Sequence, residues 1–293
     1  MSDKRVVLLA TLTILVLVLS LLLLNFLLGF SLKISIFFAL VLSAILNFLL
    51  FKYSHKLILK MYNAHPMNER IAPELCALTE ELSSKLEISP PELAVVPNTS
   101  PNIFSTGCNQ ENATCVFTDG ALGLLSTREL KCVLAHELVH IKNKDTLPYT
   151  ATAVFAGTVG YLGFTSKWFL MRRRKTEDMR INYLTQILLN LLYLTFTPIA
   201  CLLVRFVVSH EKEFETDLEA SKLCGMPEEL ASALVKIQNS IESAPFETGN
   251  PATAHLFLVN PFSRELTSNL SCHPSVEERV KRLDEIHRSS EKT

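Results

Sequence analysis

The sequence predicts a membrane protein that is mainly α-helical and carries a small β-sheet in its charged part. Its 293 residues are 48% hydrophobic and only 19% charged, and the charged share lies below the quarter that is usual for soluble chains. Four long runs contain no charged residue, at residues 6–28, 34–51, 146–166 and 181–204. An α-helix needs about 20 mainly apolar residues to cross a bilayer, so these runs predict about four transmembrane or membrane-embedded helices.

The first two uncharged runs predict a pair of N-terminal transmembrane helices within residues 1–51. Neither run has the polar stripe that a soluble helix normally carries. The first run is too long for the apolar core of a cleaved signal peptide, and no small-x-small cleavage site follows it, which indicates a retained anchor. Residues 146–208 hold the second pair and predict a membrane hairpin. Because Asn190 and Pro198 interrupt its last run, this pair either spans the membrane or is partly buried in protein.

Basic residues near these runs predict the orientation of the chain, since lysine and arginine flank the cytoplasmic ends of transmembrane helices. Such residues precede the first run and follow the second one, at Lys4, Arg5, Lys52, Lys56 and Lys60. We therefore expect a multi-pass protein of the cell membrane, with the N-terminus and the part after residue 51 facing the cytoplasm. The basic residues 172–175 lie outside if both later runs span, so the topology of the hairpin stays open.

The charged remainder predicts one domain in two parts, residues 52–145 and 209–293. The net charge of the chain is −1, which offers no electrostatic basis for binding nucleic acid. Seven cysteines without a C-x-x-C spacing indicate reduced thiols in a cytoplasmic compartment. Apolar periodicity and turn-forming residues predict strands at 93–96, 102–108 and 114–118, and helices at 73–87, 126–143, 210–223, from 227 onward and 276–287. Gly225 is expected to end the helix at 210–223 in a left-handed conformation.

One of these helices carries an H-E-x-x-H motif, formed by His136, Glu137 and His140, which predicts a zinc site. Ser126 followed by Glu129 has the spacing of a capping box and predicts where this helix begins. Two histidines four residues apart share one helical face, so both rings can bind one Zn²⁺ ion. Glu137 is rotated by about 100° from His136, so it can take a proton from the zinc-bound water. The motif predicts an α+β, zincin-like catalytic domain built from the two charged parts.

The third zinc ligand lies outside this motif, because no histidine follows at the spacing H-E-x-x-H-x-x-G-x-x-H. A hydrolytic zinc keeps three protein ligands and one water. The acidic helix expected from residue 210 offers Glu211, Glu213, Glu215, Asp217 and Glu219. Glu213 and Asp217 share one face, so one can bind the ion while the other holds a ligand in place. His210 and His273 are competing candidates, whereas His255 has no cluster around it, and the residues alone leave the choice open.

Four separated segments are similar to one known family. They are P-N-I-F-S-T-G at 101–107, V-L-A-H-E-L-V-H-I-K-N-K-D at 133–145, E-F at 213–214 with Asp217, and H-P-S-V-E-E-R at 273–279. With the hydrophobic pairs before and after the metal helix, they make nearly the whole chain resemble the HtpX family of membrane-embedded zinc peptidases, which is related more distantly to the CAAX-prenyl endopeptidases. The chain departs from the family pattern at Ile103, Ser105, Lys212 and Thr216, none of which is a candidate metal ligand.

The resemblance implies a role for each candidate residue. It makes Glu213 the third zinc ligand and makes Asp217 and Arg279 a buried acid–base pair that ties the last helix to the ligand helix. It places His273 near the developing oxyanion, with packing beside the following proline as the alternative. It makes Asn102 and its strand the edge that holds the substrate in extended form through backbone hydrogen bonds.

The resemblance further implies a membrane-anchored, zinc-dependent endopeptidase that hydrolyses membrane or misfolded proteins, as in membrane protein quality control under stress. Its partners are then polypeptide substrates and the lipid bilayer. A prenyl-protein processing peptidase is the rival among enzymes, and the short chain with only four apolar runs argues against it. The rivals outside enzymes are a membrane scaffold, a metal-storage protein and an anchored chaperone. The presence of Glu137 argues against a scaffold, which needs no base.

Overall fold

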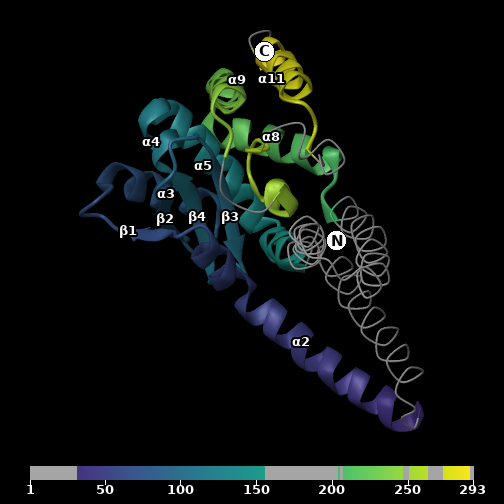
Figure 1. The fold of residues 1–293 in the computed structure, drawn as a ribbon. Coiled ribbons are helices and arrows are strands. Elements are labelled where there is room, and N and C mark those ends of the chain that lie inside the picture. Colours follow the sequence, from purple (N-terminus) through teal and green to yellow (C-terminus); the bar gives the residue numbers. More distant parts are fainter. Residues whose placement is uncertain (1–31, 156–203, 205–206, 247–250, 263–272, 291–293) are drawn as a thin grey trace, which may run out of the picture.

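The computed structural model describes residues 32–155, 204, 207–246, 251–262 and 273–290, and Figure 1 shows their arrangement. The predicted spans at 6–28 and 181–204 lie outside these residues, apart from Val204, as does the second half of the run at 146–166. Within the described part of the chain, no helix combines the length and the apolar character that crossing a bilayer requires.

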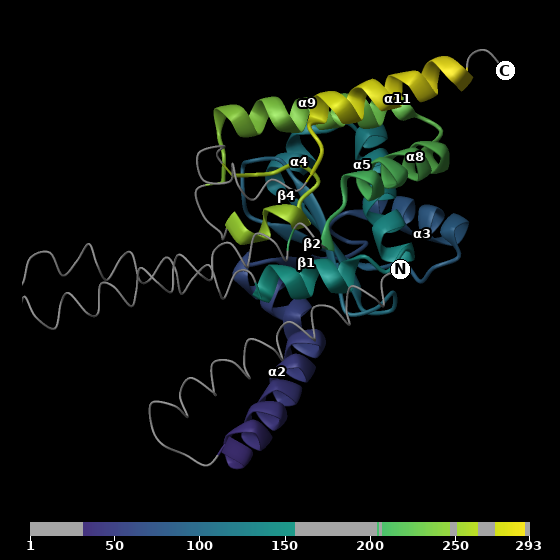
Figure 2. The same cartoon turned by 90° about the vertical axis from the view of Figure 1, so that its right-hand side faces the viewer.

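A single long helix, α2 (Leu32–Met61), contains the whole second uncharged run and continues past its end at residue 51. The continuation has no proline or glycine to stop the helix, and its Ile58 is buried in the core. Tyr62, directly after the helix, packs on Phe104 of the sheet with ring centroids 5.7 Å apart. The rest of α2 projects away from the folded domain in both views (Figures 1 and 2).

The sheet has four strands in the order β1-β2-β4-β3. They are β1 (His65–Met67), β2 (Glu92–Val96), β3 (Ile103–Gly107) and β4 (Ala113–Thr118). The pair β2–β4 is parallel, with Glu92 opposite Thr114, and the other two pairs are antiparallel. The three predicted strands are present within one or two residues of their expected bounds. Strand β1 was not predicted, because three residues are too few for a periodic pattern.

Strand β4 is an inner strand and β3 is the edge strand next to it, and both are buried throughout because their two faces are covered. Alternate side chains point to opposite faces of a sheet. Ile103 and Phe117 pack in the cluster that contains α5, whereas Phe104 and Val116 pack in a second cluster with Tyr62 and other aromatic residues. This two-sided burial holds β3 rigidly next to the helix that carries the H-E-x-x-H motif.

Helix α5 (Thr127–Lys142) is the central helix and carries this motif. Its predicted capping box is present: Ser126 Oγ accepts from the Glu129 amide at 3.3 Å, and Glu129 Oε2 accepts from the Ser126 amide at 2.9 Å. Such a cap stabilises a helix by about 1 kcal/mol. Glu129 also accepts from Lys236 of a later helix at 2.9 Å, so the cap ties α5 to the second part of the domain.

Of the remaining described helices, three pack directly on α5, and the others pack on these helices or on the sheet. The three are α3 (Pro73–Leu86), α8 (His210–Cys224) and α9 (Pro227–Ser243), and the others are the short α4 (Asp119–Leu124), the 3₁₀ helix η1 (Pro251–Leu256) and α11 (Val276–Ser290). Gly225 ends α8 in the left-handed conformation with φ of 69°, as the sequence predicts. Helices α9 and α11 lie together at the end of the molecule opposite to α2 (Figures 1 and 2). Neither α4 nor η1 was predicted.

Candidate metal centre

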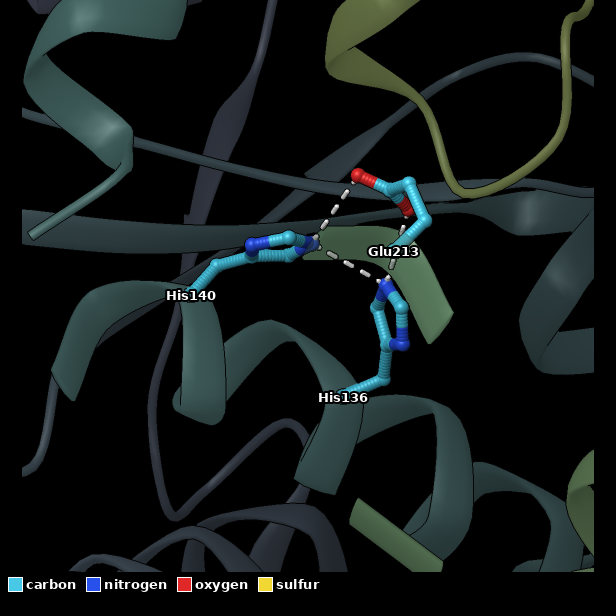
Figure 3. Close-up of side chains that lie close together, drawn as sticks. All are labelled: His136, His140 and Glu213. Carbon is cyan, nitrogen blue, oxygen red and sulfur yellow. Dashed lines mark hydrogen bonds and ion pairs between the residues drawn. The ribbon is translucent and has the colours of Figure 1, made fainter. Parts of the chain in front are cut away.

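Two facing helices bring together three side chains that can bind one metal ion, as Figure 3 shows. Helix α5 supplies His136 and His140, and α8 supplies Glu213. Their ligand atoms all lie within 4.8 Å of one another, and all three residues are buried. The Nε2 atoms of the two histidines are 3.1 Å apart, and each lies 3.6 to 3.7 Å from one carboxylate oxygen of Glu213. One side of this triangle is therefore set within α5 and the other two by the packing of α5 on α8.

The environment of Glu213 fits a cation at the centre of this triangle. Its side chain is fully buried, and neither carboxylate oxygen accepts a hydrogen bond from the described residues. Burial alone would raise the pKa of Glu213. The nearby imidazoles of His273 and His140 outweigh burial and hold this pKa well below its usual range. A buried anion without hydrogen bonds is costly unless a cation compensates it. Two imidazoles and one carboxylate are a donor set that catalytic zinc uses, with a fourth position left for water.

A carboxylate holds the far nitrogen of each histidine ring. His136 Nδ1 lies 3.0 Å from Asp217 Oδ1, and His140 Nδ1 lies 3.5 Å from Asp145 Oδ2. Such partners keep the proton on Nδ1 and leave Nε2 free to bind a metal. Burial lowers the pKa of His140, but Glu213 and Asp145 outweigh it and raise this pKa to about 9. The site therefore carries a surplus of negative charge that favours a cation.

Sequence reasoning missed Asp145 as a site residue. Lys144 adopts a left-handed conformation with φ of 58° just after α5, so the chain turns back and the Asp145 amide donates to the His140 carbonyl at 3.0 Å. The Asp145 carboxylate then lies beside the His140 ring and also pairs with Lys212 of α8. An acidic residue five positions after the second histidine was the available signal.

Asp217 and Arg279 form a bidentate pair across α8 and α11. Arg279 donates to the two Asp217 oxygens at 2.7 and 2.6 Å and also to the Leu258 carbonyl at 2.7 Å. Both side chains are buried, and although burial raises the pKa of Asp217, Arg279 brings it below its usual range. Asp217 also contacts His136. Arg279 of α11 is therefore linked to this histidine through Asp217. This is the pairing that the resemblance implied.

His273 and His255 lie beside Glu213 in the second part of the domain. His273 Nδ1 is 3.3 Å from Glu213 Oε2, and its Nε2 donates to the His255 carbonyl at 3.1 Å. His255 is buried and contacts the Tyr149 carbonyl at 3.1 Å through Nε2. No other candidate residue was predicted near His255, and this was wrong. The helix η1 lies next to the site although it is more than a hundred residues away from His136 in the sequence. His210, in contrast, is exposed at the start of α8 and is not part of the cluster.

A model of the family described as "Peptidase family M48" matches residues 69–287, which include every residue of this site. The chain belongs to peptidase family M48. Relatives described as "Protease HtpX homolog" are 37% identical over 249 residues in Pyrococcus furiosus (85% of each chain) and 38% identical over 252 residues in Methanocaldococcus jannaschii (85% of this chain and 87% of the relative). A crystal structure of S. mikatae Ste24p is 18% identical with a TM-score of 0.47, and the match covers 92% of this chain and 61% of that one.

Family membership makes this chain a zinc metalloprotease and decides between the predicted functions. The peptidase family and the protease relatives support hydrolysis of polypeptides, which the rival interpretations as scaffold, metal store or chaperone did not include. Zinc is the metal that M48 metalloproteases use, and the buried His136, His140 and Glu213 can hold one ion. The prediction of a mainly helical protein with a small mixed sheet is likewise confirmed.

The cavity of this M48 peptidase beside the candidate metal-binding residues is small, and all of its lining residues except His273 are buried. Its volume is about 10 Å³, which is about the space that one water molecule needs. Glu137 lines it together with the three metal-binding residues. The other lining residues come from β3, the segment after α5, η1 with the residues after it, and the segment before α11: Ser105, Thr146, Tyr149, His255, Leu256, Phe257, Leu258 and His273. Glu137, the candidate base, therefore lies beside a space that can hold one water molecule.

Asn102 lies just before β3 and does not line this cavity. It is fully buried, and its side-chain amide donates to the Val259 carbonyl at 2.6 Å. Its Oδ1 accepts from the Ile103 amide at 3.0 Å. The segment after η1 runs antiparallel along β3, with the Leu258 amide donating to the Ile103 carbonyl at 2.9 Å. Asn102 therefore fixes β3 to this segment, and Ser105 is the β3 residue that reaches the cavity.

Replacing Arg279 by alanine is expected to destabilise the protein by about 3–5 kcal/mol, because the buried Asp217 charge loses its partner. Thermal unfolding of the purified protein measures this change. Lys281→Ala is the matched control, since Lys281 is exposed on the same helix, and it should change stability by no more than about 0.5 kcal/mol. Equal stability of the two variants would show that the buried pair contributes nothing.

Proposed function

We propose that this protein is a membrane-anchored endopeptidase that cleaves membrane or misfolded proteins at the cytoplasmic face of the cell membrane. The observation that carries the proposal is the buried group of His136, His140 and Glu213, which shares a water-sized cavity with Glu137. The names of the relatives, each a protease HtpX homologue, support proteolysis. The choice of membrane and misfolded substrates rests on the resemblance and on the membrane location argued below.

We assign the metal-binding role to His136, His140 and Glu213, and the role of general base to Glu137. Zinc, when bound, polarises the scissile carbonyl and lowers the pKa of its water to about 7. Glu137 lines the cavity and follows His136 directly, so its carboxylate lies about 100° around α5 from His136, beside the candidate metal-binding residues. It accepts a proton from the attacking water and then donates that proton to the leaving amine nitrogen.

His273 is the candidate donor to the developing oxyanion, because it lines the same cavity. Such a donor can contribute about 3 kcal/mol to transition-state stabilisation. In the structure its Nδ1 lies near Glu213 and its Nε2 donates to the His255 carbonyl. Donation to an oxyanion therefore requires His273 to give up one of these two contacts when substrate binds.

The edge of the sheet at β3 is the candidate site for an extended substrate. Strand β3 is the last strand in the sheet, and its Ser105 lines the cavity. The segment around Phe257 already pairs with the first half of this edge. A substrate strand can therefore add only beyond Ser105, toward Gly107, unless this segment moves. Asn102 serves such binding indirectly, by holding β3 and Val259 together.

The exposed face of α2 supports a location at the membrane. Large apolar side chains are exposed along this projecting helix, at Val41, Ile45, Phe48, Leu49, Tyr53, Leu57 and Met61. Exposed apolar patches of this kind mark contact with lipid or protein. The four uncharged runs of the sequence and the basic residues that follow the second run support the same location, with the catalytic domain on the cytoplasmic side.

Replacing Glu137 by glutamine is expected to abolish cleavage while zinc stays bound, because glutamine keeps the shape but cannot accept the proton. The measurement compares the purified variant with the wild type on an unfolded membrane protein and determines zinc content by elemental analysis. Equal cleavage by the two proteins would refute the assignment of Glu137 as the base.

Replacing Glu213 by alanine is expected to release zinc, because two imidazoles alone hold the ion far more weakly than three ligands. Zinc content after dialysis measures the loss. Glu215→Ala is the matched control, because Glu215 is exposed on the same helix, and it should retain the wild-type zinc content. Full zinc retention by the Glu213 variant would assign the third ligand to another residue.

Cysteine labelling tests the proposed orientation. A cysteine introduced at Ser31, between the first two uncharged runs, should react with a membrane-impermeant maleimide in intact cells. A cysteine introduced at Glu285, which is exposed on α11, should react only after lysis. The chain without an added cysteine gives the background from its native thiols. The reverse labelling pattern would place the catalytic domain outside the cytoplasm.

A further inference from the structure

Two cysteines lie at the same helix interface as the metal-binding residues but take no part in that site. Cys132 on α5 and Cys224 at the end of α8 have their Sγ atoms 3.0 Å apart. The two helices lie side by side in both views (Figures 1 and 2). Of the described cysteines, these are the two whose sulfurs are hydrogen-bonded to each other, and both are free thiols.

The thiol contact continues a row of contacts along this antiparallel interface. Cys132, His136 and His140 follow one another at intervals of four residues on α5, so they share one face. Their partners on α8 run in the opposite order: Cys224, Asp217 and Glu213. The cysteine pair is therefore the outermost of three contacts, and the other two form and orient the metal site.

The two thiols differ in exposure and in pKa, as a nucleophilic thiol and a resolving thiol do. Cys132 is fully buried, and its S–H donates to Cys224, which is partly exposed. This hydrogen bond lowers the pKa of Cys224 to about 7, whereas the same contact and burial raise the pKa of Cys132. Reactive cysteines are low in pKa, accessible and often adjacent to a second thiol that resolves the first product.

We propose that Cys132 and Cys224 form a reversible disulfide that links α5 to α8, with a low-molecular-weight disulfide such as glutathione disulfide as the oxidant. The Cys224 thiolate attacks one sulfur of the oxidant, and one glutathione thiolate leaves. Cys132 then loses its proton to that thiolate and attacks the Cys224 sulfur, which releases the second glutathione. The second glutathione leaves as a thiolate and takes up from water the proton that Cys224 released, so two electrons pass from the protein thiols to the oxidant and two glutathione thiols are formed.

The bond is within reach of the native packing and has a consequence for the metal. Closing the sulfur contact from 3.0 Å to a bond of about 2.0 Å takes a shift of about 1 Å. Zinc leaves when Glu213 and the two histidines separate, and movement of α8 away from α5 separates them. A covalent link at the end of this interface opposes that movement, so the oxidised protein should lose zinc to a chelator several-fold more slowly.

The test uses the full-length, zinc-loaded protein in detergent and does not depend on peptidase activity. The protein is incubated with excess glutathione disulfide, its remaining thiols are alkylated, and its peptides are mapped by mass spectrometry without reduction. The expected product is one intramolecular link between Cys132 and Cys224, removed by dithiothreitol. Failure to form this link while Cys224 is glutathionylated, or preferential linkage of other cysteines, would overturn the proposal.

Two variants and a zinc measurement sharpen this test. Cys224→Ser should form no link, whereas Cys132→Ser should stop at the mixed disulfide on Cys224, because the resolving thiol is absent. Wild-type zinc content in each variant shows that it is folded, and Cys132→Ala replaces Cys132→Ser if the buried hydroxyl disturbs folding. Equal rates of zinc loss for the oxidised and reduced wild type would overturn the coupling to the metal site.

Discussion

The buried carboxylate of Glu213 is the group on which the arrangement of this domain depends. It has no exposed surface and accepts no hydrogen bond from the described residues. An uncompensated charge in such a position is strongly destabilising. Its compensation comes from the imidazoles around it and from the one metal ion that this group can hold. The packing of α8 on α5 therefore places a negative charge in the core, and this charge would destabilise the fold without a cation beside it.

Three chains of polar contacts lead outward from this centre. His136 contacts Asp217, which pairs with Arg279. His140 contacts Asp145, which pairs with Lys212. Glu213 also contacts His273, which donates to the carbonyl of His255. Each chain ends on a different element, namely α11, the start of α8 and η1. The metal site thus couples segments that are far apart in the sequence, and their packing holds the three ligands in register.

Local sequence signals predicted the parts of this arrangement that depend on neighbouring residues. The Ser126 cap, the spacing of His136 and His140 and the stop at Gly225 are all set within a few residues. The candidate third ligand could not be identified from local signals, because α8 carries five acidic residues at intervals of two. Only the resemblance to a known family singled out Glu213. The structure brings it to the histidines because α8 packs antiparallel on α5.

Asp145 and His255 show why the rest could not be predicted. Asp145 reaches His140 only because Lys144 adopts a left-handed conformation, which no local pattern indicated for a lysine. His255 reaches the site on a 3₁₀ helix whose position depends on aromatic contacts of Phe257 with Phe104 and Phe246. Both placements follow from tertiary packing, which residue spacing in one sequence does not contain.

X-ray absorption at the zinc edge, on the purified full-length protein with one zinc bound, tests the central claim most directly. We expect a shell of only nitrogen and oxygen atoms at about 2.0–2.1 Å, in which two imidazoles contribute the outer-shell scattering. A sulfur atom at about 2.3 Å, or a third imidazole in place of the Glu213 carboxylate, would contradict it.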